Sequence, residues 1–281
     1  MTTQALSVRG VTYHVEEVGE GKPLLLLHGF TGSGRVWQPF VSAWPGWRLV
    51  MVDLLGHGHT QVVPPSRCTM EHQVQDLLYV MDALGHSRFA CLGYSMGGRV
   101  ALALAVTRPH RLLGLILESS SPGLAAFAER SQRRQTDEEL ASFIEQQGIE
   151  AFVQRWESIP LFSTQRRLDA GVLARQRSVR LAQAPAGLAA SLRGMGTGCQ
   201  CSYWPQLGRL RMPTRLIVGE WDTKYRAIAE AMRTRNPALN VEVVNGAGHT
   251  VHLEQPTAFA ESVRGFLAEV AESAVSMTDW P

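Results

Sequence analysis

The stretch "CLGYSMGGRVALALA", residues 91–105, decides the fold of this chain. Its centre, "GYSMG" (93–97), matches the pattern G-x-S-x-G, with an apolar run before the serine and an alanine-rich helical run after it. In this context the pattern predicts a sharp strand–turn–helix elbow that leaves the Ser95 hydroxyl exposed. Gly93 and Gly97 are needed there, because larger side chains would crowd the tight turn.

On both sides of this stretch, short apolar runs alternate with helical patterns, as in a parallel sheet with crossover helices. Buried strands are expected at 23–30, 47–54, 88–94, 111–119, 214–220 and 240–246. Helices are expected at 71–85, 96–109 and 257–273, with a frayed end at 273–281. The first residues, with 7–18, resemble a hairpin at the sheet edge. The sequence therefore predicts an α/β fold: a mostly parallel sheet with helices on both faces.

The middle of the chain breaks this alternation. From about Ser121 to Met212 no strand-like run occurs, and the segment holds twelve arginines, eight acidic residues and no lysine. Its first half reads as two amphipathic helices, at 129–148 and 149–162. A helical cap inserted into the core is therefore predicted. The expected division is a first core part at 1–120, the cap at 121–212 and a second core part at 213–281.

Composition narrows the possible partners and the compartment. The net charge of +2 favours neither nucleic acid nor an acidic membrane surface as a partner. No apolar run approaches the length of a membrane span, so stable membrane insertion is not expected. The N-terminus shows no signal-peptide pattern, and Cys199-x-Cys201 has no second pair to complete a metal site. We expect a cytoplasmic protein with reduced thiols and no bound metal; the sequence is compatible with a homo-oligomer.

An activated serine needs a base, and the base needs an orienting acid. On this architecture the acid and the histidine follow the serine in that order, on loops after late strands. "GEWDTKY" offers Asp222 after one strand, and "GAGHTVHLEQP" offers His249 after the next. We prefer these two residues. Alternatives that stay open are Glu118 and Glu220 for the acid, and His252 for the base.

An oxyanion hole is expected beside the serine. The turn in "LHGFTGSG" should present the backbone N–H of Phe30, and the residue after the serine, Met96, should present the second N–H. The start of a helix reinforces that second donor. His28 is expected to hold this loop. A phosphate-binding role is disfavoured, because the stretch lacks the G-K-[ST] ending and the dinucleotide glycine spacing.

Taken together, these motifs resemble the α/β-hydrolase superfamily over nearly the whole chain. Five stretches, "LLLLHGFTGSGRVW", "GYSMGGRVALALA", "ESSSPGL", "LRGMGTG" and "GEWDTKY", look like the 2-succinyl-6-hydroxy-2,4-cyclohexadiene-1-carboxylate (SHCHC) synthases of menaquinone biosynthesis. The first two are widespread in the superfamily, whereas "SPGL" with its downstream arginines and "SLRGMGTG" are more specific.

The resemblance implies a lyase rather than a hydrolase. Such enzymes eliminate pyruvate from 2-succinyl-5-enolpyruvyl-6-hydroxy-3-cyclohexene-1-carboxylate, with the triad serine acting as a base and without a metal or organic cofactor. The implied substrate is a small polyanion with three carboxylates, and arginine binds carboxylates through paired donors in one plane.

The resemblance also implies a set of substrate contacts. Arg99 lies one helical turn beyond the serine and can point back toward the pocket. The implied contacts are Tyr94, Arg99, Arg133, Trp156 and Arg177. Arg130 and Arg134 remain alternatives to Arg133, and Arg180 remains an alternative to Arg177.

Two rival functions use the same scaffold. The first is a carboxylesterase or C–C bond hydrolase in which Ser95 is the nucleophile. The second is a non-enzymatic ligand receptor, which the intact triad disfavours. The pocket discriminates between the esterase and the synthase, because an esterase needs an apolar acyl site whereas the synthase needs inward-facing arginines.

Overall fold

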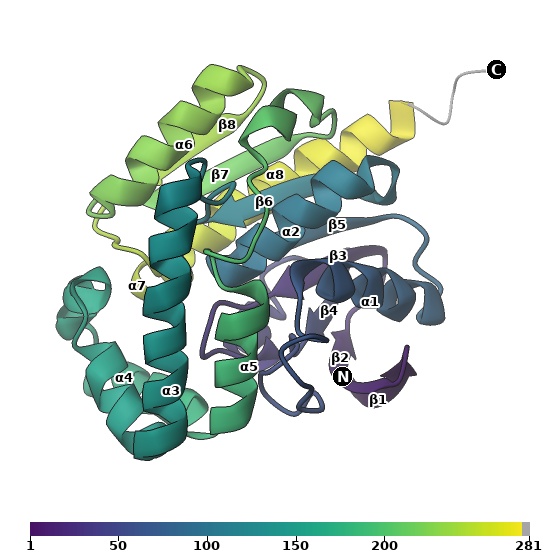
Figure 1. Cartoon of the computed structure of the whole chain (residues 1–281). Coiled ribbons are helices and arrows are strands. Elements are labelled where there is room, and N and C mark those ends of the chain that lie inside the picture. Colours follow the sequence, from purple (N-terminus) through teal and green to yellow (C-terminus); the bar gives the residue numbers. More distant parts are fainter. Residues whose placement is uncertain (277–281) are drawn as a thin grey trace.

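The computed structural model describes residues 1–276, and its centre is one eight-stranded sheet (Figure 1). The strands are β1 (Thr2–Val8), β2 (Val11–Val18), β3 (Lys22–Leu27), β4 (Trp47–Val52), β5 (Phe89–Tyr94), β6 (Leu112–Glu118), β7 (Thr214–Gly219) and β8 (Asn240–Val244). Their order across the sheet is β1-β2-β4-β3-β5-β6-β7-β8. β2 pairs antiparallel with β1 and β4, and the other neighbours are parallel. The predicted parallel sheet with an edge hairpin is confirmed.

Helices cover both faces of the sheet. Those of the core are α1 (Met70–Ala83), α2 (Met96–Thr107), α6 (Thr223–Arg235), α7 (Val251–Glu254) and α8 (Pro256–Ser276). Shorter 3-10 turns are η1 (Gly34–Phe40), η2 (Pro109–Arg111), η3 (Pro160–Arg167) and η4 (Trp204–Arg209). Residues 277–281, at the end of the segment expected to fray, lie outside the described part. Within the described residues, no helix is both long and apolar enough to cross a membrane.

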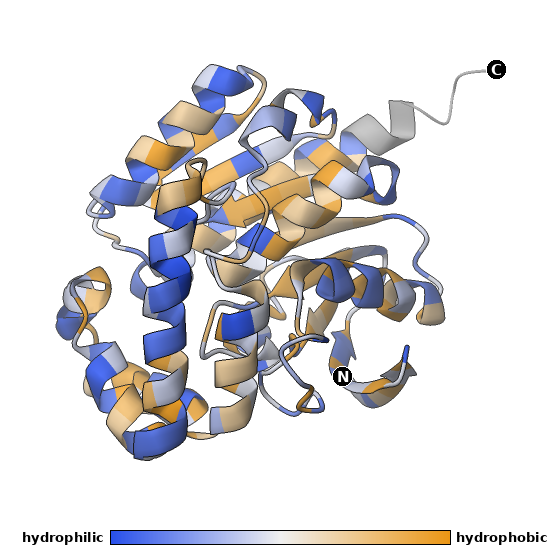
Figure 2. Cartoon of the chain, viewed as in Figure 1, coloured by the Kyte–Doolittle hydropathy of each residue, from blue (hydrophilic) through white to orange (hydrophobic). Residues whose placement is uncertain are grey.

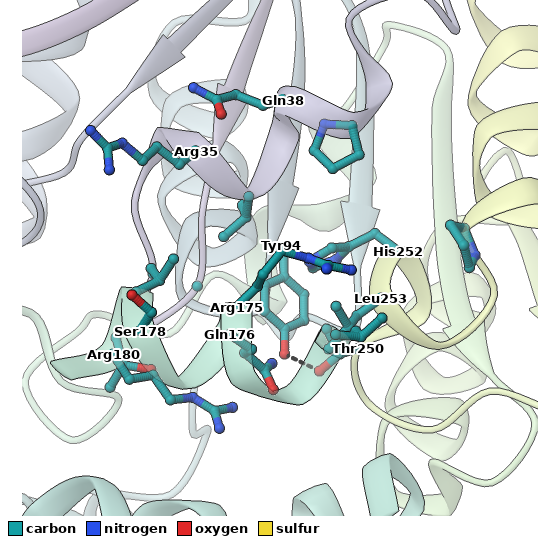
Figure 3. Close-up of a pocket in the computed structure, with 18 of the residues that line it drawn as sticks. Arg35, Gln38, Tyr94, Arg175, Gln176, Ser178, Arg180, Thr250, His252 and Leu253 are labelled. Carbon is teal, nitrogen blue, oxygen red and sulfur yellow. Dashed lines mark hydrogen bonds between the residues drawn. The ribbon is translucent and has the colours of Figure 1, made fainter. Parts of the chain in front are cut away.

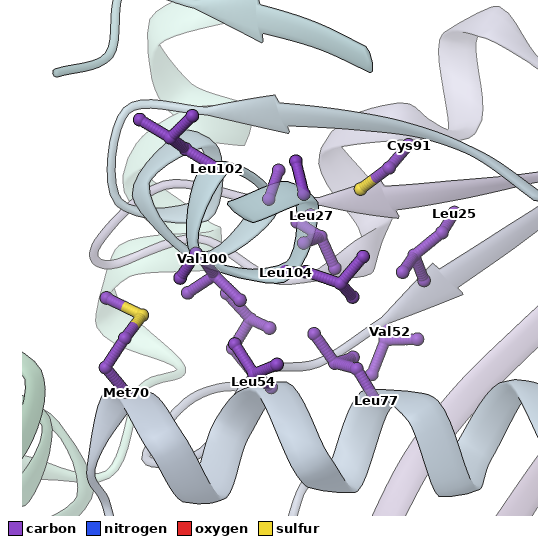
Figure 4. Packing of buried hydrophobic residues seen from close by; sticks show 14 of the residues in the cluster. Leu25, Leu27, Val52, Leu54, Met70, Leu77, Cys91, Val100, Leu102 and Leu104 are labelled. Atoms are coloured by element: carbon purple, nitrogen blue, oxygen red, sulfur yellow. The ribbon is translucent and has the colours of Figure 1, made fainter. Parts of the chain in front are cut away.

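The core is divided by the sheet into two apolar layers, as the alternation of side chains along β3 shows. Leu25 and Leu27 pack with α1 and α2 (Figure 4), whereas Leu24 and Leu26 pack on the other face with η1 and α8. Successive strand residues point to opposite faces, so a strand that is apolar throughout must be covered on both sides. Burying each such leucine contributes about 1.5–3 kcal/mol to folding.

The helices between β6 and β7 form a separate layer beside the sheet (Figure 1). They are α3 (Phe127–Glu157), α4 (Ala170–Leu181) and α5 (Pro185–Met195). The predicted break between two cap helices occurs as a kink in α3 at Gly148, whose φ is 80°. The second of these helices ends at Glu157, before the expected position. Ile144 and Phe152 pack against α5, while the outer face of α3 is largely hydrophilic (Figure 2).

Glycines let α5 lie directly on the backbone of the core. A Cβ on Gly187 would lie 2.6 Å from the carbonyl oxygen of Gly56, and one on Gly194 would lie 2.1 Å from that of Cys68. Real Cβ atoms do not approach carbonyl oxygens so closely, so neither position tolerates a side chain without movement of the backbone. Gly194 belongs to "SLRGMGTG", and its contact with Cys68 is one physical reason for that motif.

Gly194→Ala tests this contact. In a helix interior, alanine normally stabilises relative to glycine by about 0.5–1 kcal/mol. Here the clash should reverse the sign and lower the free energy of unfolding by about 1–3 kcal/mol, the usual cost of overpacking. Thermal and urea unfolding measure the change. The matched control is Gly265→Ala in α8, where the nearest atom is the end of an arginine side chain at 3.8 Å. If both variants are stabilised, the close approach is not a constraint.

Candidate active site

Ser95 sits at the elbow between β5 and α2 in a strained backbone conformation, with φ 50° and ψ −105°. Such a positive φ is costly for a residue with a side chain and persists only where the surroundings impose it. A Cβ on Gly93 would lie 2.3 Å from the Gly97 carbonyl oxygen, and one on Gly97 would lie 2.3 Å from the Leu27 carbonyl oxygen. The two glycines therefore allow the tight turn that projects Ser95 from the sheet edge.

The structure brings the three expected triad residues together. His249 Nε2 lies 3.1 Å from Ser95 Oγ, and His249 Nδ1 lies 2.7 Å from Asp222 Oδ2. Asp222 is buried, and its other carboxylate oxygen accepts the Tyr225 N–H at 3.2 Å. Asp222 follows β7 and His249 follows β8, so both lie at the carboxyl edge of the parallel strands, where sites of such folds form.

The alternative acid and base pair with each other instead. His252 Nδ1 lies 2.8 Å from Glu118 Oε2, and the His252 backbone N–H donates to Glu118 Oε1 at 3.0 Å. Both side chains are buried, and the Tyr94 ring packs between this pair and His249. Glu220 accepts the N–H of Gly246. These contacts give the alternatives structural partners of their own.

His28 holds the turn that is expected to form the oxyanion hole. The Leu54 N–H donates to His28 Nε2 at 3.0 Å, so the proton is on Nδ1, which donates to the Gly29 carbonyl at 2.8 Å. Burial lowers the pKa of His28 to about 4 and keeps the ring neutral. Within residues 1–276, the N–H groups of Phe30 and Met96 have no hydrogen-bond partner in the protein. Both donors are thus available to a developing oxyanion.

Arg99 is a buried cation beside the elbow. Its Nη1 donates to the Met195 carbonyl at 2.9 Å and to Gln200 Oε1 at 2.6 Å. Burial lowers its pKa to about 10, so the guanidinium still carries its charge at neutral pH. In the described part of the chain no carboxylate forms an ion pair with it. Its direct hydrogen-bond partners are therefore neutral and do not compensate its charge.

Of the three arginines after "SPGL", Arg133 approaches Arg99. Its positive charge contributes to the lowered pKa of Arg99, and its Nε donates to Asp137 Oδ1 at 2.7 Å. Arg130 instead donates to backbone carbonyls at the start of α3, and Arg134 reaches the Gly198 carbonyl at 3.5 Å. Of these three alternatives, Arg133 is the one whose charge acts on the pKa of Arg99.

The two candidates on α4 differ in burial. Both Arg177 and Arg180 donate to Glu157, but the Arg177 side chain is 44% exposed whereas that of Arg180 is 6% exposed. The Arg180 guanidinium lies over the Phe162 ring, 5.1 Å from its centroid, and lines a cavity that also contains Tyr94. The structure therefore places Arg180 nearer the elbow than the residue first preferred from the sequence.

Two aromatic side chains complete the surroundings. The Trp156 ring packs edge-on to Phe30 with centroids 5.4 Å apart, and its buried Nε1 has no hydrogen-bond partner within the described residues. The Tyr94 hydroxyl lies 2.8 Å from Thr250 Oγ1, and burial raises its pKa well above the ordinary value. Trp156 thus offers an unused donor, and Tyr94 is neutral at physiological pH.

Two residues that contact this site, both glutamines, were not predicted from the sequence. Gln200 reaches Arg99 from beyond "SLRGMGTG", and Gln165 donates to Thr250 Oγ1 at 2.9 Å. Neither residue carries a chemical signature in the sequence, because an isolated glutamine matches no catalytic pattern. The neighbouring motif "SLRGMGTG" was the one feature of the sequence that pointed to the region of Gln200.

Comparison with known proteins agrees with this geometry. A family model described as alpha/beta hydrolase fold matches residues 22–256. A Bacillus subtilis (strain 168) protein provisionally named SHCHC synthase is 44% identical over 264 residues, which cover 93% of this chain and 96% of that protein. The SHCHC synthase of Serratia proteamaculans (strain 568) is 31% identical, over 87% of this chain and 92% of that enzyme.

Solved structures also match the fold of this chain. The structure of MenH from S. aureus matches with a TM-score of 0.88 and 33% identity, covering 92% of this chain and 98% of that one. The chain belongs to the SHCHC synthase family of α/β-hydrolase fold proteins. The family predicted from the motifs is therefore confirmed. A malate-bound thermophilic esterase from Thermogutta terrifontis also matches, with a TM-score of 0.82 and 26% identity over 96% of this chain and 99% of that one.

Asp222→Asn tests which acid orients the base. The variant should slow modification of Ser95 by phenylmethylsulfonyl fluoride by about two to four orders of magnitude, because an amide favours the wrong imidazole tautomer. Mass spectrometry of the intact protein measures the rate. Glu118→Gln is the control and should leave that rate close to the wild-type value while lowering thermal stability. Equal slowing in both variants would contradict the assignment of Asp222.

Proposed function

We propose that the chain is an SHCHC synthase that eliminates pyruvate from 2-succinyl-5-enolpyruvyl-6-hydroxy-3-cyclohexene-1-carboxylate in menaquinone biosynthesis. The observation that carries this proposal is the buried Arg99 guanidinium, which lies one helical turn from Ser95 and has no carboxylate partner among the described residues. A cation held in this way suits an anionic substrate. The similarity to the Bacillus subtilis and Serratia proteins supports the same reaction.

The reaction starts when His249, oriented by Asp222, draws the proton from the Ser95 hydroxyl. The serine oxygen then removes the ring proton beside the succinyl ketone, and negative charge moves onto the ketone oxygen. The N–H groups of Phe30 and Met96 stabilise this enolate, and one such donor is worth about 3–4 kcal/mol. The enolate collapses through the ring double bond, the carbon–oxygen bond to the enolpyruvyl group breaks, and the leaving oxygen takes the proton held by His249, so that pyruvate leaves as its enol. Ser95 acts as a base, so no acyl-enzyme forms.

The three carboxylates of the substrate are bound by arginines from two sides. Arg99 and Arg133 lie near each other beside the elbow, where their like charges favour an anion between them. On α4 we assign the contact to Arg180. Glu157 accepts hydrogen bonds from both Arg177 and Arg180 and supports Arg180 in its position. Two or more guanidinium groups fix the orientation of the substrate ring and also raise the affinity for the substrate.

The remaining contacts are aromatic. Tyr94 donates from its hydroxyl, and Trp156 donates from the Nε1–H that has no partner in the described protein. Residues 121–212 act as the cap over a core formed by 1–120 and 213–281. The step is redox-neutral and its proton transfers use Ser95 and His249, so it requires neither a metal nor an organic cofactor. Four free cysteines suit a cytoplasmic enzyme.

The alternative function is hydrolysis, because the thermophilic esterase has a similar structure. In that reaction the same serine would attack an ester or ketone carbon and form a covalent intermediate. The positive charge of Arg99 disfavours hydrolysis of an apolar ester, because an apolar acyl group gains nothing from an uncompensated guanidinium. A non-catalytic receptor would have no use for the strained Ser95 elbow or for the assembled triad.

Pyruvate release decides the function. Wild-type protein incubated with the enolpyruvyl substrate should form pyruvate, measured by coupled oxidation of NADH, and Ser95→Ala should reduce the rate by about 10³-fold or more. Rapid quenching and mass spectrometry should detect no covalent adduct on Ser95 during turnover. Rapid hydrolysis of aryl esters without pyruvate formation would overturn the proposal, and wild-type activity in Ser95→Ala would remove this serine from the mechanism.

Gln200 supports the substrate-binding role of Arg99. Gln200→Leu should raise KM about tenfold or more with little change in kcat, because losing one charged hydrogen bond costs about 1.5–3 kcal/mol and releases the guanidinium from its position. Steady-state pyruvate formation measures both constants. Gln206→Leu, a change of a nearby glutamine in the chain that is only partly buried, should leave KM unchanged. An equal effect on kcat and KM in Gln200→Leu would indicate general disruption of the fold instead.

A further inference from the structure

A glutamine from the segment between β6 and β7 enters the hydrogen bonds around Tyr94. Gln165, in η3, donates from Nε2 to Thr250 Oγ1 at 2.9 Å. The same Thr250 Oγ1 lies 2.8 Å from the Tyr94 hydroxyl (Figure 3). Gln165 and Thr250 are both buried. The three side chains form a continuous series of hydrogen bonds, which we call the Gln165–Thr250–Tyr94 relay.

Packing of η3 against the loop of His249 fixes the position of Gln165. A Cβ on Gly248 would lie 2.2 Å from Thr164 Oγ1, so a side chain before His249 would collide with η3. On the same turn, the centroid of the Phe162 ring lies 6.3 Å from that of the His249 ring. These contacts hold η3, and with it Gln165, beside the catalytic histidine.

The hydrogens available in the relay determine its direction. Thr250 Oγ1 accepts the Gln165 N–H, and its own hydrogen needs an acceptor inside the protein, because Thr250 is 2% exposed. Within residues 1–276, the acceptor at hydrogen-bond distance is the Tyr94 oxygen. If Tyr94 donated to Thr250 instead, the threonine hydrogen would be buried without a partner, which is costly. Thr250 therefore donates to Tyr94.

This direction leaves the Tyr94 hydrogen unused. Burial raises the pKa of Tyr94 well above its ordinary value, so the phenol keeps its hydrogen at neutral pH. In the described part of the chain no acceptor for this hydrogen is within reach. Tyr94 and Arg180 line one cavity, which we assign to the substrate. A carboxylate is the complementary acceptor there, and a hydroxyl that already accepts a hydrogen bond donates more strongly.

We propose that Gln165 is a positioning residue: through Thr250 it sets the direction in which the Tyr94 hydroxyl donates, so that this hydrogen bond goes to a carboxylate of the substrate. The inference rests on the proposed function, in which Tyr94 contacts the substrate. Gln165 comes from the segment between β6 and β7, whereas Tyr94 ends β5 and Thr250 precedes α7. The relay is therefore complete only when that segment is packed against the sheet edge.

The kinetics of pyruvate formation test the positioning role. Gln165→Met keeps the length of the side chain and removes its hydrogen-bond donor. It should raise KM about threefold to tenfold with little change in kcat, the usual net effect of one hydrogen bond on binding.

Gln183→Met is the matched control. Gln183 is as buried as Gln165 and also joins the segment between β6 and β7 to the core, because its Oε1 accepts the Gly58 N–H at 2.9 Å. It takes no part in the relay. Its variant should lower thermal stability and leave KM unchanged. A rise in KM in Gln183→Met equal to that in Gln165→Met would contradict a specific role of Gln165.

A double variant decides whether Gln165 acts through Tyr94. Tyr94→Phe removes the hydroxyl, so adding Gln165→Met to it should change KM by less than about twofold, as expected when the second change has lost its route to the substrate. If Gln165→Met raises KM by the same factor in the wild-type and Tyr94→Phe backgrounds, the glutamine acts independently of the tyrosine and the proposal is overturned.

The direction of the relay has a measurement of its own that needs no substrate. Ultraviolet resonance Raman spectra of wild-type protein minus Tyr94→Phe isolate the Fermi doublet of Tyr94. Its intensity ratio is high when the phenolic oxygen accepts a hydrogen bond and low when the hydroxyl donates without accepting. Wild-type protein should show the ratio of an accepting oxygen, and Gln165→Met should lower it.

The Raman result also separates the two proposals. A ratio typical of donation without acceptance in the wild-type protein overturns the relay, whether or not pyruvate forms. The ratio of an accepting oxygen in a protein that forms no pyruvate contradicts the proposed function and leaves the direction of the relay standing.

Discussion

The close backbone contact between the start of α2 and the end of β3 is the constraint on which the site depends. Because a Cβ at Gly97 would lie 2.3 Å from the Leu27 carbonyl, the helix can begin there only with glycine. That contact holds Ser95 at φ 50° and sets the start of α2 against the backbone of Leu27 and His28, which leads into the Phe30 turn. The strain, about 1–3 kcal/mol, is offset by the apolar layers that fix both elements on the sheet.

The parts of the molecule that follow from local chemistry were predictable from the sequence. Apolar runs predicted the strands. The order of the acid and the histidine along the chain, on the loops after β7 and β8, predicted Asp222 and His249. The distinction between Arg177 and Arg180 was not predictable, because residues three apart lie on the same side of a helix. Only the packing of α4, with Glu157 and Phe162 as neighbours, buries one of them and exposes the other. The role of Gln200 was not predictable either, because its partner Arg99 lies 101 residues away along the chain.

Burial of Arg99 explains why its direct hydrogen-bond partners are neutral. Removing a guanidinium from water is costly, and a carboxylate partner would compensate the charge but also cancel its attraction for a substrate. The Met195 carbonyl and the Gln200 amide instead satisfy one end of the group by hydrogen bonds and leave its net charge uncompensated. Asp137, whose charge raises the pKa of Arg99, is already bonded to Arg133. The fold therefore maintains a charge that an anion can neutralise.

This arrangement bears on how one triad can serve two kinds of chemistry. In ester hydrolysis and in elimination, the same N–H pair stabilises negative charge on a carbonyl oxygen. The reactions differ in which atom faces the serine oxygen: the carbonyl carbon, or a hydrogen on the carbon next to it. Those positions are about one bond length apart, and a displacement of that size is enough to change rates by orders of magnitude. Arginines that fix the carboxylates of a rigid ring can set this displacement, whereas the triad alone cannot. Under the proposed function, specificity for elimination is therefore a property of α2 and the helices between β6 and β7 rather than of Ser95, His249 and Asp222.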